Sequence, residues 1–267
     1  MVRMRSPVRL WLAAPMPHKP CAVVAFFYKQ LKSIMGGNKQ MLTEQIFMGM
    51  KYLTQLPDNF DQNKKYPVII LMHGAGTRAK DTDKLRNHGF FSMIQKYTQF
   101  PCVTVAPLCS ENTWFDMFET LNKFAEFIST QDYADADRIY LTGNSMGGYA
   151  SWQMAMSNPT LYAALIPICG GGMYWNAARI AKMPIWAFHG DSDPVVKTEE
   201  SQKMVDKINA CGGNAKLTIY EDCGHNSWAR TWHNVEVFEW LFSQNRKNQV
   251  NSNAIEDEKY DNSEKFG

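Results

Sequence analysis

The chain has 267 residues, of which 45% are hydrophobic, an ordinary share for a globular protein that excludes a wholly disordered chain. Its formal net charge of +2 is unevenly spread, because residues 1–40 contain seven Lys or Arg and no acid. The other 227 residues therefore hold 21 of the 28 basic residues against all 26 acidic ones, a balance that predicts no binding to nucleic acid. No apolar run approaches the length of a membrane span, about 18 residues or more, so no stable membrane insertion is predicted.

Residues 1–40 form a basic leader with three open interpretations: a disordered or structural arm, a targeting segment, or a mis-assigned start codon. Its arginines precede short apolar stretches, as in a signal peptide, but no clean apolar core and small-residue cleavage site follow. Met35 and Met41 both precede the first convincing strand, which favours a start codon placed too far upstream.

The six cysteines show neither a CxxC motif nor the dense spacing of a secreted disulfide scaffold. Several lie in apolar, strand-like runs, where a reduced cysteine behaves as a small hydrophobic residue. This pattern predicts a reducing, cytoplasmic location, with export as the alternative if the leader is a signal sequence.

Between residues 41 and 244, short β-rich runs alternate with longer helical patterns. The first run, residues 44–57, predicts one half-buried strand with Ile46, Met48 and Met50 on a common face. Residues 66–74 read YPVIILMHG, a continuous apolar run that is typical of a strand covered on both faces. Further strands are predicted at residues 102–108, 137–143, 163–170, 183–190 and 215–222.

Helical patterns lie between and after these strands, at residues 88–100, 118–130, 146–158, 198–213 and 231–244. The alternation predicts an α/β fold with a mostly parallel central sheet and helices on both faces, in one catalytic domain of residues 41–244. In open sheets of this kind, functional groups gather at the carboxyl ends of the strands. Residues 245–267 are polar and mixed in charge, and they predict a disordered tail.

The segment LTGNSMGGYASW, residues 141–152, places one serine among three glycines between a predicted strand and a predicted helix. Gly143-Asn144-Ser145-Met146-Gly147 matches the G-x-S-x-G pattern of a nucleophilic serine, which requires this strand–turn–helix setting. Small residues flank the serine because strand and helix pass close together there. Ser145 is therefore the candidate nucleophile, although a turn serine without catalytic function would have the same surroundings.

A serine hydroxyl near neutral pH needs an adjacent base, which is itself oriented by a third group. Asp191 and Asp193 follow one predicted strand, and His225 follows the last, so the order is serine, acid, histidine. From the pattern alone either acid could orient His225, while the other caps a turn. Four other histidines are assigned to turns or packing: His73, His88, His189 and His233.

A tetrahedral oxyanion also needs hydrogen-bond donors aimed at it, and backbone N–H groups supply them in this type of site. The N–H of Met146 follows the nucleophile, and that of Ala75 lies in the glycine-containing loop after the strand at residues 66–74. Trp114, Tyr174 and Trp175 are candidates for the wall of an apolar substrate pocket, with packing under a loop as the alternative. No metal site and no cofactor are predicted, because the histidines are scattered and neither HExxH, GxGxxG nor a phosphate-binding loop occurs.

Five motifs in one order resemble the α/β-hydrolase superfamily, in particular its phospholipase/carboxylesterase and polyhydroxybutyrate-depolymerase-like esterases. The resemblance runs from about residue 45 to 244, and the motifs read YPVIILMHGAG, DRIYLTGNSMGGYASW, PICGGG, PIWAFHGDSDPVV and GHNSW. The resemblance implies that Ser145 is the nucleophile, that Asp193 rather than Asp191 is the acid, and that His225 is the base.

The predicted function is a serine hydrolase that cleaves carboxylic esters through an acyl-enzyme intermediate. Its partner would be a small-molecule or carbohydrate-linked ester, with acyl or aryl groups on carbohydrate as candidates. One alternative keeps the same three residues in a serine peptidase of the prolyl-oligopeptidase-like type. Another is a non-catalytic binding protein on this fold. The sequence predicts no oligomeric state.

Overall fold

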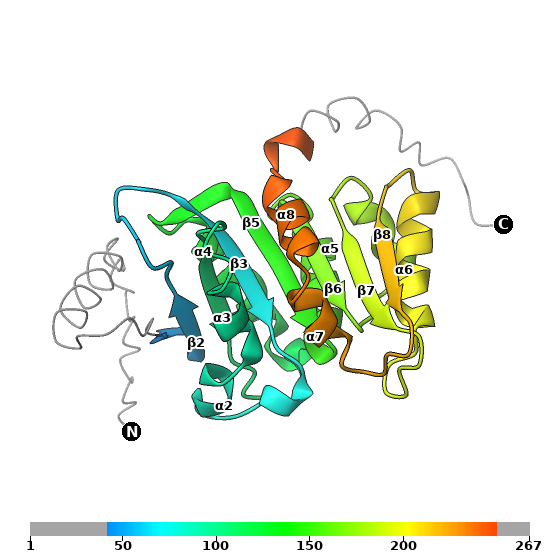
Figure 1. Ribbon diagram of the computed structural model, residues 1–267, viewed down its shortest axis with the longest axis horizontal. Helices are drawn as coiled ribbons and strands as arrows, with labels where there is room; N and C mark the ends of the chain where they lie inside the picture. Colours follow the sequence, from blue (N-terminus) through cyan, green and yellow to red (C-terminus); the bar gives the residue numbers. More distant parts are fainter. Residues whose placement is uncertain (1–41, 250–267) are drawn as a thin grey trace, which may run out of the picture. The chain divides into compact units, whose positions relative to one another are not determined.

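The computed structural model describes residues 42–249 (Figure 1). The predicted basic leader, residues 1–40, lies outside the described residues, as does the part of the predicted tail from residue 250 onward.

Within the described residues, eight strands form one sheet in the order β1-β2-β4-β3-β5-β6-β7-β8. The strands are β1 Thr43–Phe47, β2 Met50–Gln55, β3 Tyr66–Met72, β4 Val103–Pro107, β5 Ala134–Asn144, β6 Ala164–Ile168, β7 Trp186–Gly190 and β8 Lys216–Tyr220. All neighbouring pairs from β4 to β8 are parallel, whereas β2 runs antiparallel to both β1 and β4. The predicted mostly parallel sheet is confirmed.

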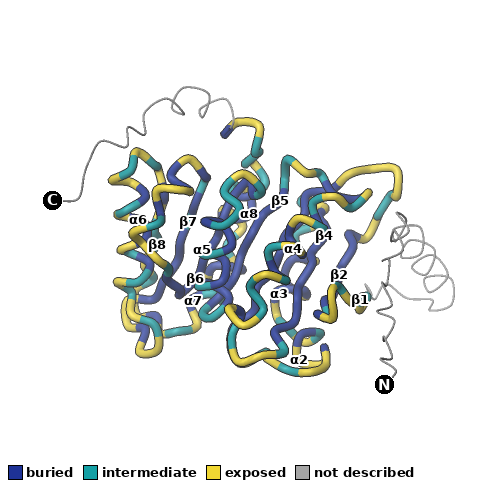
Figure 2. The backbone as a smooth tube through the Cα atoms, turned by 180° about the vertical axis from the view of Figure 1, so that it is seen from behind, coloured by how far each residue is buried: buried dark blue, intermediate teal, exposed yellow. Residues whose placement is uncertain are grey.

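Helices cover both faces of the sheet, as predicted. The helices are α2 Asp83–Arg86, α3 Gly89–Ile94, α4 Phe118–Ser129, α5 Met146–Ser157, α6 Glu199–Ala210, α7 Ser227–Trp232 and α8 Val235–Ser243. On one face α7 contacts both α3 and α8, and on the other α4 contacts α5. All seven residues of β3 are buried, because a central strand covered on both sides has no solvent-facing side. Figure 2 shows the same burial along the central strands, with exposed residues on the outer helices and loops.

The single strand predicted at residues 44–57 is wrong, because the chain forms the hairpin of β1 and β2 there. Met48 and Gly49 make the two-residue turn with φ of 48° and 84°, and both angles are positive as in the tight turns that join antiparallel strands. The turn also separates the residues predicted to share a face. Ile46 and Met48 are 66% and 60% exposed, whereas Met50 is buried.

The folded part continues past residue 244, where the predicted domain ends. The backbone N–H of Arg246 donates to the Asp137 carbonyl, and its guanidinium contacts the Asp137 carboxylate at 3.1 Å. Gln249 is buried and donates a hydrogen bond of 2.7 Å to the Ala163 carbonyl. Residues 245–249 are therefore packed against the end of the sheet, since polar side chains there find partners in the fold.

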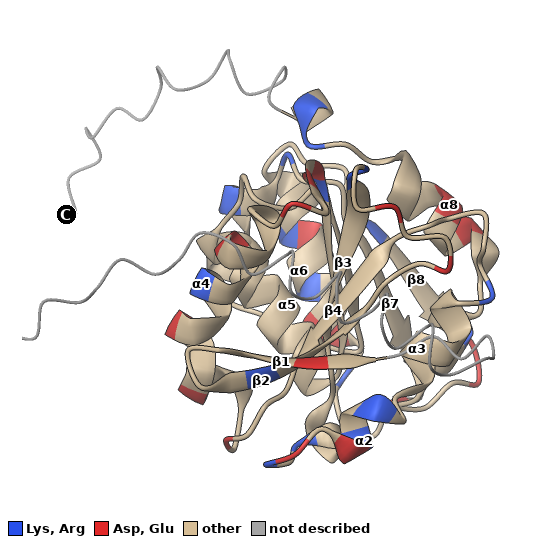
Figure 3. Ribbon diagram, turned by 90° about the vertical axis from the view of Figure 1, so that its left-hand side faces the viewer, with Lys and Arg blue, Asp and Glu red and all other residues tan. Residues whose placement is uncertain are grey.

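Charged residues of both signs alternate over the helices and loops in the view of Figure 3. Among the described residues, no helix combines the length and the apolar character that crossing a bilayer would require.

Candidate active site

Ser145 is the single residue between β5 and α5, because β5 ends at Asn144 and α5 begins at Met146. Its backbone angles are φ 55° and ψ −121°, a conformation that non-glycine residues rarely adopt. Such residues cluster at functional sites, where the surrounding contacts hold the backbone in place. One of these contacts is the hydrogen bond of 2.9 Å from the Ser145 N–H to the Ile168 carbonyl at the end of β6. The turn thus presents the Ser145 hydroxyl at the carboxyl edge of the sheet.

The glycines around Ser145 allow strand and helix backbones to approach closely. A Cβ atom at Gly143 would lie 2.4 Å from the carbonyl oxygen of Gly147. A Cβ atom at Gly147 would lie 2.0 Å from the carbonyl oxygen of Met72 in β3. Because backbone atoms cannot retreat as a flexible side chain can, any larger residue at either position would push α5 away from the sheet.

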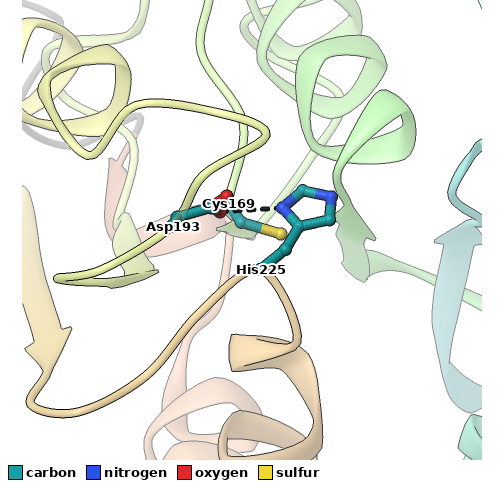
Figure 4. Close-up of side chains that lie close together, drawn as sticks. All are labelled: Cys169, Asp193 and His225. Carbon is teal, nitrogen blue, oxygen red and sulfur yellow. Dashed lines mark hydrogen bonds and ion pairs between the residues drawn. The ribbon is translucent and has the colours of Figure 1, made fainter.

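His225 joins Ser145 and Asp193 through its two ring nitrogens. Its Nε2 lies 2.9 Å from the Ser145 Oγ, and its Nδ1 lies 2.7 Å from the Asp193 Oδ2 (Figure 4). A carboxylate only accepts hydrogen bonds, so the proton is on Nδ1 and Nε2 accepts from the serine hydroxyl. The three residues come from the turn after β5 and the loops after β7 and β8, and they meet because parallel strands bring their carboxyl ends to one edge.

The Asp193 side chain is fully buried and remains ionised through its hydrogen bonds. Burial by itself would raise the pKa of this carboxyl, but the hydrogen bonds from His225 and from backbone N–H groups outweigh it and lower the pKa. The backbone donors are Val195 and Val196, at 2.8 and 3.0 Å from the Asp193 Oδ1. A buried carboxylate held in this way orients the imidazole and stabilises its protonated form.

Asp191 occupies a different position from Asp193. Its carboxylate accepts hydrogen bonds from the backbone N–H groups of Asp222 at 3.2 Å and Cys223 at 3.1 Å. These contacts tie the loop after β7 to the segment that leads into His225. The structure therefore places Asp193 against the histidine ring and uses Asp191 to cap the adjoining turn, a choice that the sequence pattern alone left open.

The loop that carries Ala75 is held by His73. The His73 Nε2 accepts from the Cys109 N–H at 3.0 Å, so the ring proton is on Nδ1, which donates to the Gly74 carbonyl at 2.8 Å. Burial lowers the pKa of His73 to about 4, so the ring is neutral at neutral pH. In a trans peptide the C=O and N–H point in opposite directions, so this bond directs the Ala75 N–H away from His73.

A cleft of about 820 Å³ opens beside Ser145 and His225, with Ala75 in its lining. One wall comes from α2 and α3, and the other comes from α7. The side chains that line the cleft include Lys84, His88, Trp228 and the largely buried Met93 and Trp232. Ligand sites commonly combine apolar walls with a few polar groups in this way. The cleft can therefore hold an apolar group attached to a carbonyl carbon at Ser145.

Trp228 and His88 place an indole ring and a neutral imidazole ring in the lining of this cleft. Trp228 meets His225 edge to face, with 5.4 Å between ring centroids, so it both supports the histidine and lines the cleft. His88 accepts the Phe90 N–H through Nδ1 and packs against Trp232. Burial lowers the pKa of His88 to about 4, which keeps this ring neutral as well.

The predicted pocket wall is wrong for Trp114, which is fully buried and donates from Nε1 to the His73 carbonyl at 2.9 Å. Tyr174 and Trp175 are 49% and 66% exposed and are not part of the cleft lining. Sequence reasoning missed Met93 and Trp232. Both lie within helical patterns that it recognised, but their spacing could not show that α3 and α7 would contact each other at the edge of the cleft.

The fold and these side chains define a class of protein, the α/β hydrolases, as the sequence motifs suggested. A family model described as the dienelactone hydrolase family matches residues 56–252. The chain belongs to this family. The motifs had pointed more narrowly to phospholipase/carboxylesterase and polyhydroxybutyrate-depolymerase-like esterases, which are other branches of the superfamily.

Known proteins share the fold and parts of the sequence. Feruloyl esterase D of Neurospora crassa is 23% identical over 197 residues, which cover 65% of this chain and 68% of that protein. The crystal structure of a thermostable esterase superposes with a TM-score of 0.70 and 33% identity over 77% of this chain, which spans only 63% of that one. Dipeptidyl peptidase 4 of Porphyromonas gingivalis shares the fold, with a TM-score of 0.57 and 14% identity over 78% of this chain and 36% of that chain. The family and the two esterases indicate one enzyme class, the carboxylic ester hydrolases.

Proposed function

We propose that the chain hydrolyses carboxylic esters with Ser145 as nucleophile, His225 as base and Asp193 as the group that orients the base. The observation that carries the proposal is the continuous hydrogen bonding from the Ser145 Oγ through both nitrogens of His225 to the Asp193 carboxylate. This arrangement has the donor and acceptor directions that nucleophilic catalysis by serine requires.

The reaction proceeds in two acyl transfers. As the Ser145 Oγ bonds to the ester carbonyl carbon, its proton passes to the His225 Nε2, and the carbonyl π electrons move to oxygen. The C–O bond to the alcohol then breaks, and the imidazolium returns the proton to the departing alkoxide. Water next attacks the acyl-enzyme, with His225 again accepting the proton, and the carboxylic acid leaves while Ser145 recovers its hydrogen.

The negative oxygen formed in each transfer is stabilised by backbone donors. We assign this role to the N–H groups of Met146, the first residue of α5, and Ala75, which lies in the same cleft as Ser145. The helix N-terminus adds its favourable dipole to the Met146 donor. The loss of a single donor of this kind costs roughly 2.7–4 kcal/mol of transition-state stabilisation in other enzymes.

The proposed substrates are aromatic acyl esters, including those linked to carbohydrate. Two features support this choice: the feruloyl esterase among the relatives, and the cleft, which Trp228 lines and at whose edge the largely buried Met93 and Trp232 lie. At about 820 Å³ the cleft falls within the usual size of small-molecule sites. A flat aromatic acyl group would lie along the tryptophans, with its carbonyl carbon at Ser145.

The peptidase alternative has weaker support, because this chain spans only 26% of the probable dipeptidyl-aminopeptidase B of Paracoccidioides brasiliensis, to which it is 23% identical over 234 residues. The Porphyromonas gingivalis peptidase is 14% identical and shows the fold alone. A non-catalytic binding protein would have no need for a serine hydroxyl bonded to an oriented imidazole. One experiment separates the three. Purified protein is assayed with methyl ferulate, p-nitrophenyl acetate and a prolyl-peptide anilide, and it is labelled with a fluorophosphonate.

We expect ester hydrolysis, negligible anilide cleavage, and labelling that is lost in Ser145→Ala. Preferential cleavage of the anilide would establish the peptidase instead. A wild-type protein that neither reacts with the fluorophosphonate nor hydrolyses the esters would overturn the proposal in favour of a binding protein.

A further inference from the structure

Cys169 has an unusual backbone position directly after β6. Its φ is 39°, so this non-glycine residue lies in the left-handed region, and its side chain is completely buried. The Cys169 N–H donates to the Phe188 carbonyl at 2.8 Å, which helps to hold that conformation. Ser145 also has a positive φ, and strained residues of this kind concentrate at functional sites.

The Cys169 thiol lies beside the two residues that activate Ser145. The Cys169 Sγ, a carboxylate oxygen of Asp193 and a ring nitrogen of His225 all lie within 4.8 Å of one another. Figure 4 shows the sulfur next to the dashed hydrogen bond between Asp193 and His225. Thiolate, imidazole and carboxylate are the three ligand types that zinc takes in proteins.

The spacing of these atoms is close to that of a metal site. With metal–ligand distances of about 2.0–2.3 Å, tetrahedral zinc places its ligand atoms about 3.3–3.6 Å apart. The three atoms here are within 4.8 Å, so side-chain movements of about 1 Å would bring them onto one ion. Of the three residues, His225 lines the cleft, whereas Cys169 and Asp193 are buried, so zinc would enter from the His225 side.

We propose that Cys169, Asp193 and His225 bind a zinc ion and that this binding switches the hydrolase off. Bonds form from zinc to the Cys169 sulfur, an Asp193 oxygen and the His225 Nδ1. The S–H bond of Cys169 breaks, and its proton goes to solvent. The Nδ1–H bond of His225 also breaks, and a proton is taken up from solvent at Nε2. The hydrogen bond between Nδ1 and Asp193 is lost, and three protein ligands leave a fourth position open.

The loss of activity follows from the histidine tautomer, a step that rests on the proposed function. A neutral imidazole that binds zinc through Nδ1 carries its proton on Nε2. The nitrogen that faces the Ser145 Oγ then becomes a donor and cannot accept the serine proton. Zinc would therefore stop the first acyl transfer without filling the substrate cleft.

Zinc inhibition tests the proposal with p-nitrophenyl acetate as substrate. Each variant is compared with its own rate without metal, and zinc is then titrated. Loss of one ligand should raise the half-inhibiting zinc concentration in Cys169→Ala at least about tenfold, since even changes to outer-shell partners cost 10–100-fold in affinity. The matched control Cys211→Ala removes a thiol near the end of α6 and should leave the value unchanged. Equal inhibition of the wild type and Cys169→Ala would overturn the proposal.

Cobalt(II) provides a readout that does not depend on turnover. Cobalt substitutes for zinc, and a thiolate ligand gives a sulfur-to-metal charge-transfer band in the near ultraviolet. We expect this band in the wild type and in Ser145→Ala. It should be absent from both Cys169→Ala and Cys169→Ser, the second of which retains a small polar side chain if alanine impairs folding. A wild-type protein without the band would refute the metal site, whereas a band in a protein without esterase activity would refute only the proposed function.

Discussion

His73 donates a hydrogen bond of 2.8 Å from Nδ1 to the carbonyl oxygen of Gly74, and so determines which way the next peptide N–H points. That N–H belongs to Ala75, the proposed second oxyanion donor. His73 is fully buried and has no atom in the cleft lining, so it acts through the loop and not on the substrate.

Replacing His73 should therefore lower the rate of acyl transfer more than it weakens substrate binding. We expect kcat of His73→Gln on p-nitrophenyl acetate to fall about 10-fold or more, because a misdirected oxyanion donor costs up to 10²–10³ in kcat in other enzymes. KM should change less than kcat. Steady-state kinetics tests this, and an equal change in both constants would assign His73 a general structural role.

The two acids after β7 should differ sharply in their effect on activity. Asp193→Asn should reduce kcat about 10⁴-fold, because the amide can present its N–H to His225 and favour the wrong tautomer. Asp191→Asn retains a carbonyl oxygen for the backbone N–H groups of Asp222 and Cys223, so we expect a loss of less than about tenfold. Measured kcat values for the two variants decide the matter, and similar losses would require a new assignment of the acid.

Gly147 should tolerate no side chain, whereas Gly76 should accept one. The Cβ of Gly147→Ala would lie 2.0 Å from the Met72 carbonyl oxygen, and we expect the free energy of unfolding to fall by about 3 kcal/mol or more. A Cβ at Gly76 meets nothing within 4 Å, so Gly76→Ala is the matched control. Urea unfolding curves measure both, and equal stabilities would show that α5 can move away from β3.

Stability should fall with pH below neutrality because His73 and His88 are buried and neutral. Burial lowers the pKa of each to about 4, whereas the unfolded histidine has a pKa of about 6.5. Between these values the unfolded chain binds more protons than the folded protein. The two neutral histidines therefore stabilise the folded protein fully at pH values above the pKa of histidine in the unfolded chain. This stabilisation is lost as the pH falls toward their pKa in the folded protein.

Each of the two histidines should contribute a slope of up to about 1.4 kcal/mol per pH unit in that window. Urea unfolding at pH 7, 6 and 5 measures the slope for the wild type and for His88→Gln. We expect a shallower slope in the variant, because one of the two proton-binding sites is removed. An unchanged slope would mean that His88 binds protons as readily in the folded protein as in the unfolded chain.

The acyl group should bind in the cleft beside Trp228 of α7 and not beside the exposed aromatics after β6. Trp228→Ala should raise KM for methyl ferulate about tenfold, the equivalent of the roughly 1.4 kcal/mol that an aromatic contact can contribute. Trp175→Ala is the control, since that side chain is 66% exposed and does not line the cleft. A larger effect from Trp175→Ala would move the acyl site to the segment after β6.

Much of the fold could be predicted because it follows from local patterns. The buried run of β3 and the alternation of strands and helices predict a mostly parallel sheet, since such strands must be covered on both faces. The hairpin at Met48 and Gly49 escaped prediction because methionine rarely takes a positive φ, and the run has no ordinary turn residue besides one glycine.

The site shows the same division between short-range and long-range information. The elbow at Ser145 could be predicted because a strand–turn–helix with flanking glycines is encoded within a few residues. The pocket could not, since Trp114 turned inward to the His73 carbonyl, and the cleft formed where α3 and α7 meet. The grouping of Cys169 with Asp193 and His225 joins three separate strand ends, so no spacing along the chain reveals it.

The sequence by itself determined the class of fold, the nucleophile turn and the order of the candidate residues, because each depends on neighbours in the chain. The family resemblance pointed to Asp193, and the structure shows that this acid faces the imidazole. The tertiary structure alone decided which helices line the cleft and where the buried thiol lies. Those relationships join residues far apart in the chain, such as Tyr97 and Trp232 at 135 positions, and only the packing of the fold brings such residues together.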